Sequence, residues 1–341
     1  MGYRYIGSKM RVVDEIIDYL NISVGRGGRF IDAFSGTGIV ASRAADNGWP
    51  VRINDMMYSA CIMSETRLIS HGEAPFDSFG GQEGAIMALN NLEGIEGYFF
   101  SEYSPASIYS CGIERKYFSE RNARHIDAIL YQIREWENRR EINPNEKKVL
   151  LAALMCAVND IANIAGTYGC FLSKWSSQSL QELTLVPLAL RDMPVDYYVS
   201  NQDVYEVAST MADVVYLDPP YTKRQYASYY HILETMAIGD NPVISGVAGL
   251  RPWRNKASVF CYKAKALSAL CNLIISQPAR CVLLSYSDEG HVELSELVEC
   301  LEKAGTVRVE ELGRIGRYRP NAQASSNKSS VNEYLVDFRH E

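Results

Sequence analysis

The sequence predicts an α/β fold in which a largely parallel sheet carries an inserted, mainly helical region. Strands and helices alternate within the first seventy residues, as in the βαβα units that build parallel sheets. Two further apolar strands follow much later, at 213–221 and 280–290. The stretch between these regions has a different composition. One sheet domain made from both ends of the chain accounts for all three observations.

The first part of the chain predicts four regular elements after an opening helix. Residues 9–21 place apolar side chains at helical spacing. GRGGRFIDAFSGTG, residues 25–38, predicts a short buried strand between two glycine-rich turns, and a helix over 38–47 begins at the second turn. VRIND, residues 51–55, predicts another strand, and a helix over 56–70 completes the unit.

The middle of the chain predicts the insertion. Residues 71–144 are richer in Gly, Asn, Ser, Tyr and charged residues, although 120–140 has helical spacing. Residues 145–165 predict a strongly apolar helix. We therefore expect residues 1–70 and 196–341 to form the sheet domain and residues 71–195 to be inserted into it.

The last part of the chain predicts the rest of the sheet. DVVYLDPPY, residues 213–221, is a buried strand ending in a Pro-Pro turn, and RCVLLSYSDEG, residues 280–290, is a second one. An amphipathic helix is expected over 292–304. Residues 307–313 and 332–338 alternate apolar and polar side chains, which predicts two paired edge strands.

Composition excludes several classes of protein. The chain has 341 residues, 47% of them hydrophobic, and no run of apolar residues long enough for a transmembrane helix. The first residues lack the apolar core of a secretory signal. None of the eight cysteines has CxxC spacing and the five histidines are scattered, so we expect buried thiols, a reducing cytoplasmic location and no metal site. The net charge of −7 restricts any DNA contact to local basic patches.

The first candidate site is FIDAFSGTG, where the first strand ends. Gly36 and Gly38 permit positive φ angles and close approach to a ligand. Neither the phosphate-binding loop with its Lys-Ser/Thr nor the GxGxxG dinucleotide motif is present. A cofactor with an ammonium and no phosphate fits better, so Asp32 is expected to face the methionine amino group of S-adenosylmethionine. Asp55, after the second strand, is placed to accept ribose hydroxyls.

The second candidate site is Asp218-Pro219-Pro220-Tyr221, after the apolar strand VVYL. Two prolines fix a rigid turn that has no backbone N–H to donate. Asp218 and the Pro219 carbonyl can accept the two hydrogens of an aromatic amine and aim its lone pair at a methyl donor. Catalysis would then come from positioning and from dipoles directed at the developing positive charge. Tyr221 supplies a face on which a flipped base can stack.

FIDAFSGTG followed by DPPY resembles the Dam-like DNA adenine-specific (N6) methyltransferases of restriction-modification systems and phages. The resemblance implies a Rossmann-like S-adenosylmethionine-dependent methyltransferase sheet, and it extends over nearly the whole chain. Tyr5-Ile6-Gly7-Ser8-Lys9 is similar to the N-terminal cofactor-binding motif of the family, and Asn201-Gln202-Asp203-Val204 to the segment that meets the cofactor adenine. The expected cofactor residues are therefore Tyr5, Lys9, Asp32, Phe34, Gly36, Gly38, Asp55, Asp203 and Val204.

Three places in the chain, one single arginine and two basic stretches, are candidates for DNA contacts. Arg224 follows Tyr221 closely and could bind a phosphate near the flipped base. Arg251, Arg254 and Lys256 belong to a basic and aromatic cluster over 251–265. A second stretch contains Arg317 and Arg319. As in the resembling family, base-edge readout is expected in residues 71–195.

The sequence thus predicts a site-specific adenine-N6 methyltransferase that acts on double-stranded DNA by base flipping and direct in-line transfer. It would be the modification enzyme of a restriction-modification system, with a possible cognate endonuclease as partner, or an orphan or phage methylase, in the cytoplasm of a bacterium or phage-infected host. The alternatives are methylation of the exocyclic amine of cytosine or of an RNA base, and a non-catalytic regulator on the same fold. In related methyltransferases, enzymes that methylate the cytosine amine more often have Ser at this position, and ribosomal RNA enzymes more often have Asn. By this resemblance, Asp218 favours adenine as the target.

Overall fold

The computed structural model describes residues 9–316 and 330–341 and divides into two compact units. The sheet unit consists of the described residues among Tyr5–Leu68, Val195–Tyr226 and Lys256–Glu341. The helical unit consists of Ile69–Pro194 and Ala227–Asn255. Tyr5, Arg317 and Arg319 lie outside the described residues.

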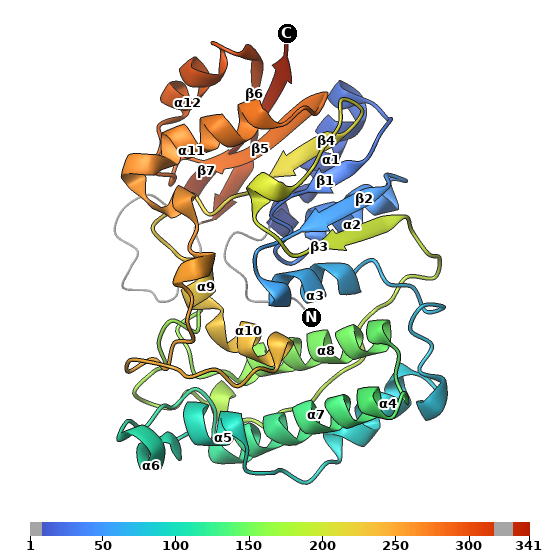
Figure 1. Ribbon diagram of the computed structural model, residues 1–341, viewed down its shortest axis with the longest axis vertical. Helices are drawn as coiled ribbons and strands as arrows, with labels where there is room; N and C mark the ends of the chain where they lie inside the picture. Colours follow the sequence, from blue (N-terminus) through green and yellow to red (C-terminus); the bar gives the residue numbers. More distant parts are fainter. Residues whose placement is uncertain (1–8, 317–329) are drawn as a thin grey trace. The chain divides into compact units, whose positions relative to one another are not determined.

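A seven-stranded mixed sheet organises the sheet unit (Figure 1). Its strand order is β3-β2-β1-β4-β5-β7-β6; the first five strands are parallel, and β7 runs antiparallel to both β5 and β6. This confirms the predicted α/β, Rossmann-like class. The strands are β1 Phe30–Asp32, β2 Val51–Asn54, β3 Tyr197–Ser200, β4 Val214–Leu217, β5 Cys281–Ser287, β6 Gly305–Gly316 and β7 Ser330–His340.

Helices cover both faces of this sheet, as the apolar parallel strands require. One core packs α1 and α2 against the sheet, and the other packs α11 and α12 against the opposite face (Figure 1). The helices of this unit are α1 Val13–Tyr19, α2 Ile39–Asp46, α3 Tyr58–Thr66, α11 Lys263–Ser276 and α12 Leu294–Leu301, with short turns η1 Lys9–Arg11, η2 Leu20–Val24, η5 Val204–Glu206 and η7 Val259–Cys261.

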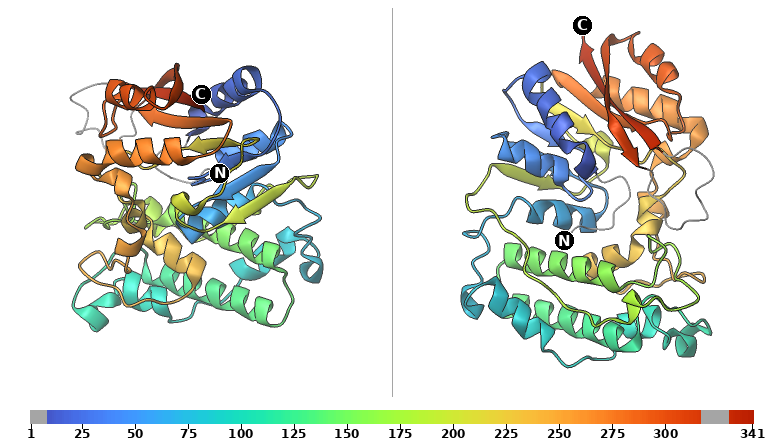
Figure 2. Two further views of the ribbon diagram at one scale, coloured as in Figure 1. Left: turned by 45° about the horizontal axis from the view of Figure 1, so that its top comes forward. Right: turned by 180° about the vertical axis from the view of Figure 1, so that it is seen from behind.

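The C-terminal hairpin differs from the prediction in one respect. The strands β6 and β7 pair with each other as expected, and Figure 2 shows them from behind as a long hairpin. Only β6 is an edge strand, however, because β7 also pairs with β5 through Val282–Phe338 to Ser287–Glu333. The expectation of two edge strands was therefore wrong. The sequence also gave no prediction for β3, with four residues, or for α11, which begins inside the basic cluster 251–265.

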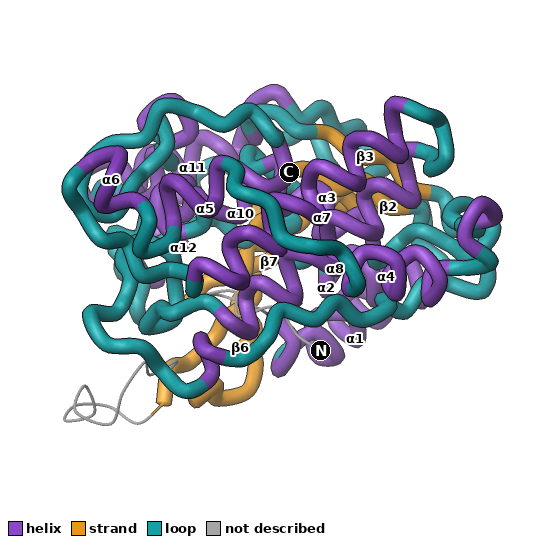
Figure 3. Tube along the Cα trace, turned by 90° about the horizontal axis from the view of Figure 1, so that it is seen from below, coloured by secondary structure: helices purple, strands orange, loops and turns teal. Residues whose placement is uncertain are grey.

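The helical unit contains the two helices predicted in the middle of the chain. The capping box of Asn143 and Glu146 begins α8, with a proline in its first turn. Ser119 caps α7 through the N–H of Asn122. Figure 3 draws the helices of this unit in purple and the loops that connect them in teal. The helices and turns are η3 Asp77–Phe79, α4 Gln82–Asn90, α5 Tyr98–Tyr103, α6 Ser107–Cys111, α7 Glu120–Asn138, α8 Pro144–Ile161, η4 Gln178–Leu180 and α10 His231–Ile238. Two short elements, α9 Tyr226–Tyr229 and η6 Arg254–Lys256, contain residues of both units.

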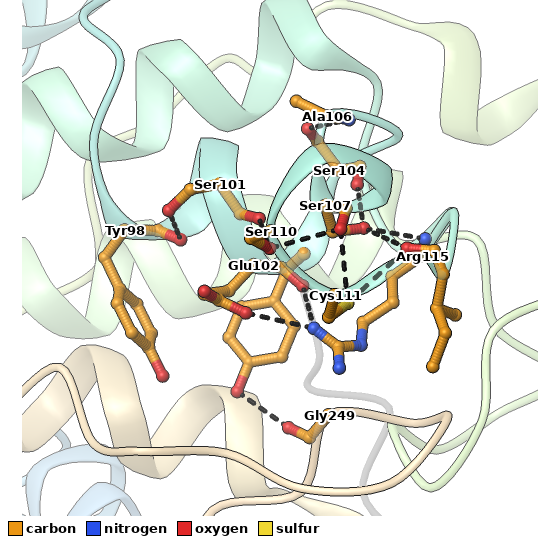
Figure 4. Close-up of polar contacts among 12 residues, drawn as sticks. Tyr98, Ser101, Glu102, Ser104, Ala106, Ser107, Ser110, Cys111, Arg115 and Gly249 are labelled. Atoms are coloured by element: carbon orange, nitrogen blue, oxygen red, sulfur yellow. Dashed lines mark hydrogen bonds and ion pairs between the residues drawn. The ribbon is translucent and has the colours of Figure 1, made fainter.

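Residues 227–255, placed with the sheet by the sequence-based division, belong to the helical unit because α10 and the following loop pack there. Buried Arg115 donates to the carbonyls of Gly246 and Val247 at 3.2 and 3.1 Å and also pairs with Glu102 at 3.0 Å. Tyr103 donates to the carbonyl of Gly249 at 3.0 Å (Figure 4). These bonds join the loop after α10 to α5 and to the segment that contains Arg115.

Candidate active site

The two predicted motifs lie at the same edge of the sheet. The strands β1 and β4 are adjacent and parallel, with Asp32 opposite Tyr216. The turn after β1, which contains Gly36, and the turn after β4, which begins at Asp218, therefore leave the sheet side by side. This is the arrangement that a shared site requires.

Asp32 is a buried carboxylate at the end of β1. Its side chain is 1% exposed, and among the described residues its Oδ1 atom has no hydrogen-bond partner. Burial, with smaller contributions from Asp218 and Asp55, raises the pKa of Asp32 to about 8. A buried carboxylate oxygen without a donor is costly, and a cationic N–H donor would relieve that cost.

The glycine turn is closed by Asp55. The N–H groups of Gly36 and Met57 donate to its two carboxylate oxygens at 3.0 and 2.9 Å. Gly36 and Gly38 have positive φ angles of 51° and 75°, as predicted. At Gly38 the close neighbour is protein, because a Cβ atom there would lie 2.5 Å from the Cα of Ser64.

Lys9 lies at the centre of a buried polar cluster. Its side chain is 3% exposed, and its Nζ atom is 3.1 Å from Oδ1 of Asp218 and 3.3 Å from Oε2 of Glu333. It also donates to the hydroxyl of Tyr221 at 3.4 Å. The sequence predicted that Lys9 lies near the cofactor. In the structure its Nζ atom contacts Asp218 and Tyr221, the first and last residues of the proline turn.

The charges of this cluster are mutually dependent. Burial opposes ionisation of Lys9, but Asp218, Tyr221 and Glu333 together raise its pKa well above the usual value. Burial also raises the pKa of Asp218 and of Glu333, while Lys9 acts in the opposite direction on both. Two carboxylates therefore share one ammonium, and removing that ammonium would leave both of them buried without a counter-charge.

Backbone contacts hold the proline turn in place. The Tyr221 carbonyl accepts the N–H of His291 at 2.9 Å, and Cys261 donates to the carbonyls of Arg224 and Pro220 at 3.3 and 3.7 Å. The rings of Tyr221 and Tyr286 lie 5.1 Å apart at 59°. Tyr221 is thus a partly buried side chain with a fixed ring.

The remaining predicted cofactor residues lie around the same edge. Phe34 follows Asp32 and contacts Phe260 edge-on, with ring centroids 5.8 Å apart. Asp203 caps the turn η5, where its Oδ1 accepts the N–H of Tyr205 at 3.0 Å. Val204 is 7% exposed and belongs to the hydrophobic core.

The predicted DNA-contact residues have different environments. Arg251 is 11% exposed and forms a two-pronged pair with Asp240, at 2.8 and 3.2 Å, inside the helical unit. Lys256 donates to the carbonyl of Met56 at 3.0 Å. Arg224 is half-buried and Arg254 is exposed. Arg251 would therefore have to leave an internal ion pair to reach a phosphate.

Sequence reasoning missed Glu333 and Tyr286. Glu333 shares a face of β7 with Leu335 and Asp337, so carboxylates stand at two positions of an alternating strand where apolar side chains would be expected. That pattern was visible in the sequence, but it indicates burial only once β7 is known to be an interior strand. Asn54, also missed, joins the ends of β1 and β3 through the carbonyl of Ala33 and the hydroxyl of Ser200, at 3.2 and 2.9 Å.

Residues 9–316 and 330–341 contain no group of three or more His, Cys, Asp or Glu side chains arranged to hold a metal ion. None of the helices in these ranges has the length and apolar character needed to cross a membrane.

Comparison with known proteins agrees with this geometry. The family model for D12 class N6 adenine-specific DNA methyltransferases matches residues 5–299. The type II methyltransferase M.FokI of Planomicrobium okeanokoites is 33% identical over 97% of this chain and 52% of its own length, and the modification methylase StsI of Streptococcus sanguinis is 31% identical over 97% and 51%. The chain spans about half the length of these two relatives. The type II methyltransferase M.NlaIII of Neisseria lactamica is 31% identical over 88% of both chains.

Proposed function

Because the chain belongs to the D12 class N6 adenine-specific DNA methyltransferase family, we propose that it transfers a methyl group from S-adenosylmethionine to N6 of adenine in double-stranded DNA. The transfer is direct and in line, onto a base flipped out of the duplex. One observation carries the proposal: adjacent parallel strands lead to the proline turn at Asp218 and to Asp32, whose Oδ1 atom has no partner in residues 9–316 and 330–341.

The residues after β1 and β2 suit the cofactor. When bound, S-adenosylmethionine supplies an electrophilic methyl group on a sulfonium. The unpartnered Oδ1 of Asp32 is matched to an ammonium donor, and Asp55 stands where carboxylates accept ribose hydroxyls. Phe34, Asp203 and Val204 border the adenosyl group in this proposal, as do Gly36 and Gly38, with Tyr5 contributing from outside the described residues.

The proline turn acts on the amine. Asp218 and the Pro219 carbonyl accept its two hydrogens, which directs the nitrogen lone pair away from the ring and towards the methyl group. Pro219 and Pro220 keep competing N–H donors out of this position. Lys9, in contact with both Asp218 and Tyr221, holds the turn in its working geometry.

DNA binding rests on local positive charge and on the helical unit. Arg224, Arg254 and Lys256 contact phosphates, and so do Arg317 and Arg319 in this proposal; Arg251 contributes only if it leaves Asp240. Residues 71–195 read the base edges. Because M.FokI and StsI are named as a type II methyltransferase and a modification methylase, we propose a modification role, with an endonuclease of the same specificity as partner.

Incubation with tritiated S-adenosylmethionine tests this function. The protein is offered unmethylated double-stranded DNA, RNA or no nucleic acid, and the labelled base is identified after hydrolysis. Label in N6-methyladenine from DNA is expected. Label in cytosine, or only in RNA, would contradict the proposal and support one of the alternative substrates. Absence of label would indicate a non-catalytic protein. Sequencing of methylated adenines in DNA from an expressing host then gives the recognised site.

Asp32→Asn is expected to abolish S-adenosylmethionine binding while stabilising the free protein. The carboxyl has a raised pKa in the folded state, about 8 against an ordinary value of 3.8, so the folded protein binds more protons than the unfolded one between these values. Wild-type stability therefore falls as the pH rises through this window, and the asparagine variant avoids that loss. Calorimetric titration and thermal melts between pH 5 and about 8 check both effects.

Asp196→Asn, an exposed carboxylate beside β3, is the matched control. It should change neither cofactor affinity nor the pH dependence of the melting temperature. Retained cofactor affinity in Asp32→Asn would remove Asp32 from the cofactor site.

Tyr221→Ala is expected to weaken base flipping by about 1–3 kcal/mol, the usual contribution of one base–aromatic stack, and to affect cofactor binding little. Fluorescence of 2-aminopurine at the target position of the recognised duplex measures flipping. Tyr221→Phe separates stacking from the contact with Lys9, because it keeps the ring and loses only the hydroxyl. Tyr198→Ala, at a 60% exposed tyrosine on the edge strand β3, serves as the control. Equal losses of flipping and cofactor affinity would contradict the stacking role.

A further inference from the structure

Glu333 is a buried carboxylate that the mechanism has not used so far. It lies on β7, opposite Ser287 of β5 and Leu312 of β6, and is 7% exposed. The strand β5 separates β7 from β4, after which the proline turn begins. The Nζ atom of Lys9 bridges the two carboxylates, at 3.3 Å from Oε2 of Glu333 and 3.1 Å from Oδ1 of Asp218.

The number of N–H donors on the Lys9 ammonium equals the number of acceptors around it. An ammonium has three N–H donors, and Nζ of Lys9 is within 3.4 Å of three acceptors, on Asp218, Tyr221 and Glu333. Two of these acceptors belong to the proline turn and one to β7. Without Glu333, one donor would lose its acceptor and the ammonium would interact with Asp218 alone among carboxylates.

We propose that Glu333 is a positioning residue that, by sharing the ammonium of Lys9, fixes the carboxylate of Asp218 and keeps it a strong hydrogen-bond acceptor for the target amine. This inference rests on the proposed function and adds a residue to its site. A carboxylate paired fully with an ammonium is a weak acceptor, because its charge is already neutralised. A second carboxylate on the same ammonium reduces that neutralisation while leaving the geometry intact.

The electrostatics are consistent with this role. The carboxylate of Asp218 raises the pKa of Glu333 as a like charge, and Lys9 lowers the pKa of both carboxyls. Because repulsion between like charges is reciprocal, we expect loss of the Glu333 charge to lower the pKa of Asp218. The other charged or titratable groups that face this pair are Asp32 on β1, Tyr216 on β4, Tyr221 in the proline turn and Asp288 after β5.

Glu333→Gln tests the proposal because it keeps an acceptor for Lys9 and removes only the charge. We expect kcat to fall about tenfold, because Asp218 becomes a weaker acceptor for the target amine, with KM for DNA and cofactor unchanged. The acid limb of the pH–rate profile should move to lower pH. Glu311→Gln, an exposed glutamate on the adjacent strand β6, is the matched control and should leave kcat and the acid limb unchanged.

A second measurement does not depend on turnover. The carbon-13 shift of the Asp218 carboxyl, assigned by its loss in Asp218→Asn, reports its titration in the free protein. In Glu333→Gln the titration should move to lower pH, and in Glu333→Asp, which keeps the charge, it should move less. Glu333→Met, a second uncharged variant, decides the question if the glutamine variant does not fold.

Unchanged titration of Asp218 in the uncharged variants would overturn the inference, whether or not the protein methylates DNA. Shifted titration with no DNA methylation by the wild type would contradict the proposed function, and the coupling of Glu333 to Asp218 would remain supported. The two failures are therefore distinguishable.

Discussion

Lys9→Met is expected to destabilise the protein by about 3–5 kcal/mol and to abolish methylation, because it leaves the carboxylates of Asp218 and Glu333 buried without their shared cation. The loss should depend on pH. Without Lys9 the pKa values of both carboxyls in the folded state rise further above their unfolded values near 4, so folding requires protonation. The difference in the free energy of unfolding between wild type and Lys9→Met should therefore be smallest near pH 5 and grow towards about pH 8.

Denaturant unfolding between these pH values measures the effect. Lys303→Met, which removes a lysine with 71% side-chain exposure, is the control and should change stability little. The double variant Lys9→Met/Glu333→Gln should recover part of the lost stability, because only one buried carboxylate remains. A pH-independent deficit would show that the cluster is not the source of the destabilisation.

Asp218→Ala is expected to lower kcat roughly 10³-fold, as loss of a group that stabilises developing charge does, while cofactor binding remains measurable. The fold should survive this change, because Lys9 keeps Glu333 as a counter-charge at 3.3 Å. Single-turnover methylation and calorimetric titration with S-adenosylmethionine separate the two properties. Asp218→Asn, which keeps the shape and loses the charge, should fall between alanine and wild type.

Glu310→Ala on the edge strand β6 is the control for the loss of a carboxylate. It should retain full turnover. Unchanged turnover in Asp218→Ala would remove Asp218 from the mechanism, and loss of cofactor binding in that variant would instead assign it to the cofactor site.

The local elements could be predicted because their signals are local. The glycine turn after β1, the proline turn after β4 and the capped helices α7 and α8 are each specified by neighbouring residues, and each lies within a few residues of its predicted range. The short strand β3 and the helix α11 carried weaker signals. Four residues are too few to show a period, and the basic residues that begin α11 were interpreted as a DNA-contact patch.

The order of the strands in the sheet was harder to predict from the sequence. Alternating side chains over 307–313 and 332–338 correctly indicated a hairpin, but not that β5 pairs with its second strand. Residues 227–255 similarly carry no local signal that assigns α10 to the helical unit. Pairing and packing of this kind depend on which distant surfaces meet, and a periodic pattern does not report that.

The sequence by itself determined the fold class, the two motifs and the chemistry they favour, because glycine, proline and carboxylate in those positions restrict the backbone and the acceptors directly. The tertiary structure alone decided which charges meet. It joined Lys9 to Tyr221 and Glu333 across 212 and 324 residues of chain, and it buried Asp32 with an Oδ1 atom that has no donor among the described residues. Such contacts arise from strand order, and burial then makes their charges depend on one another.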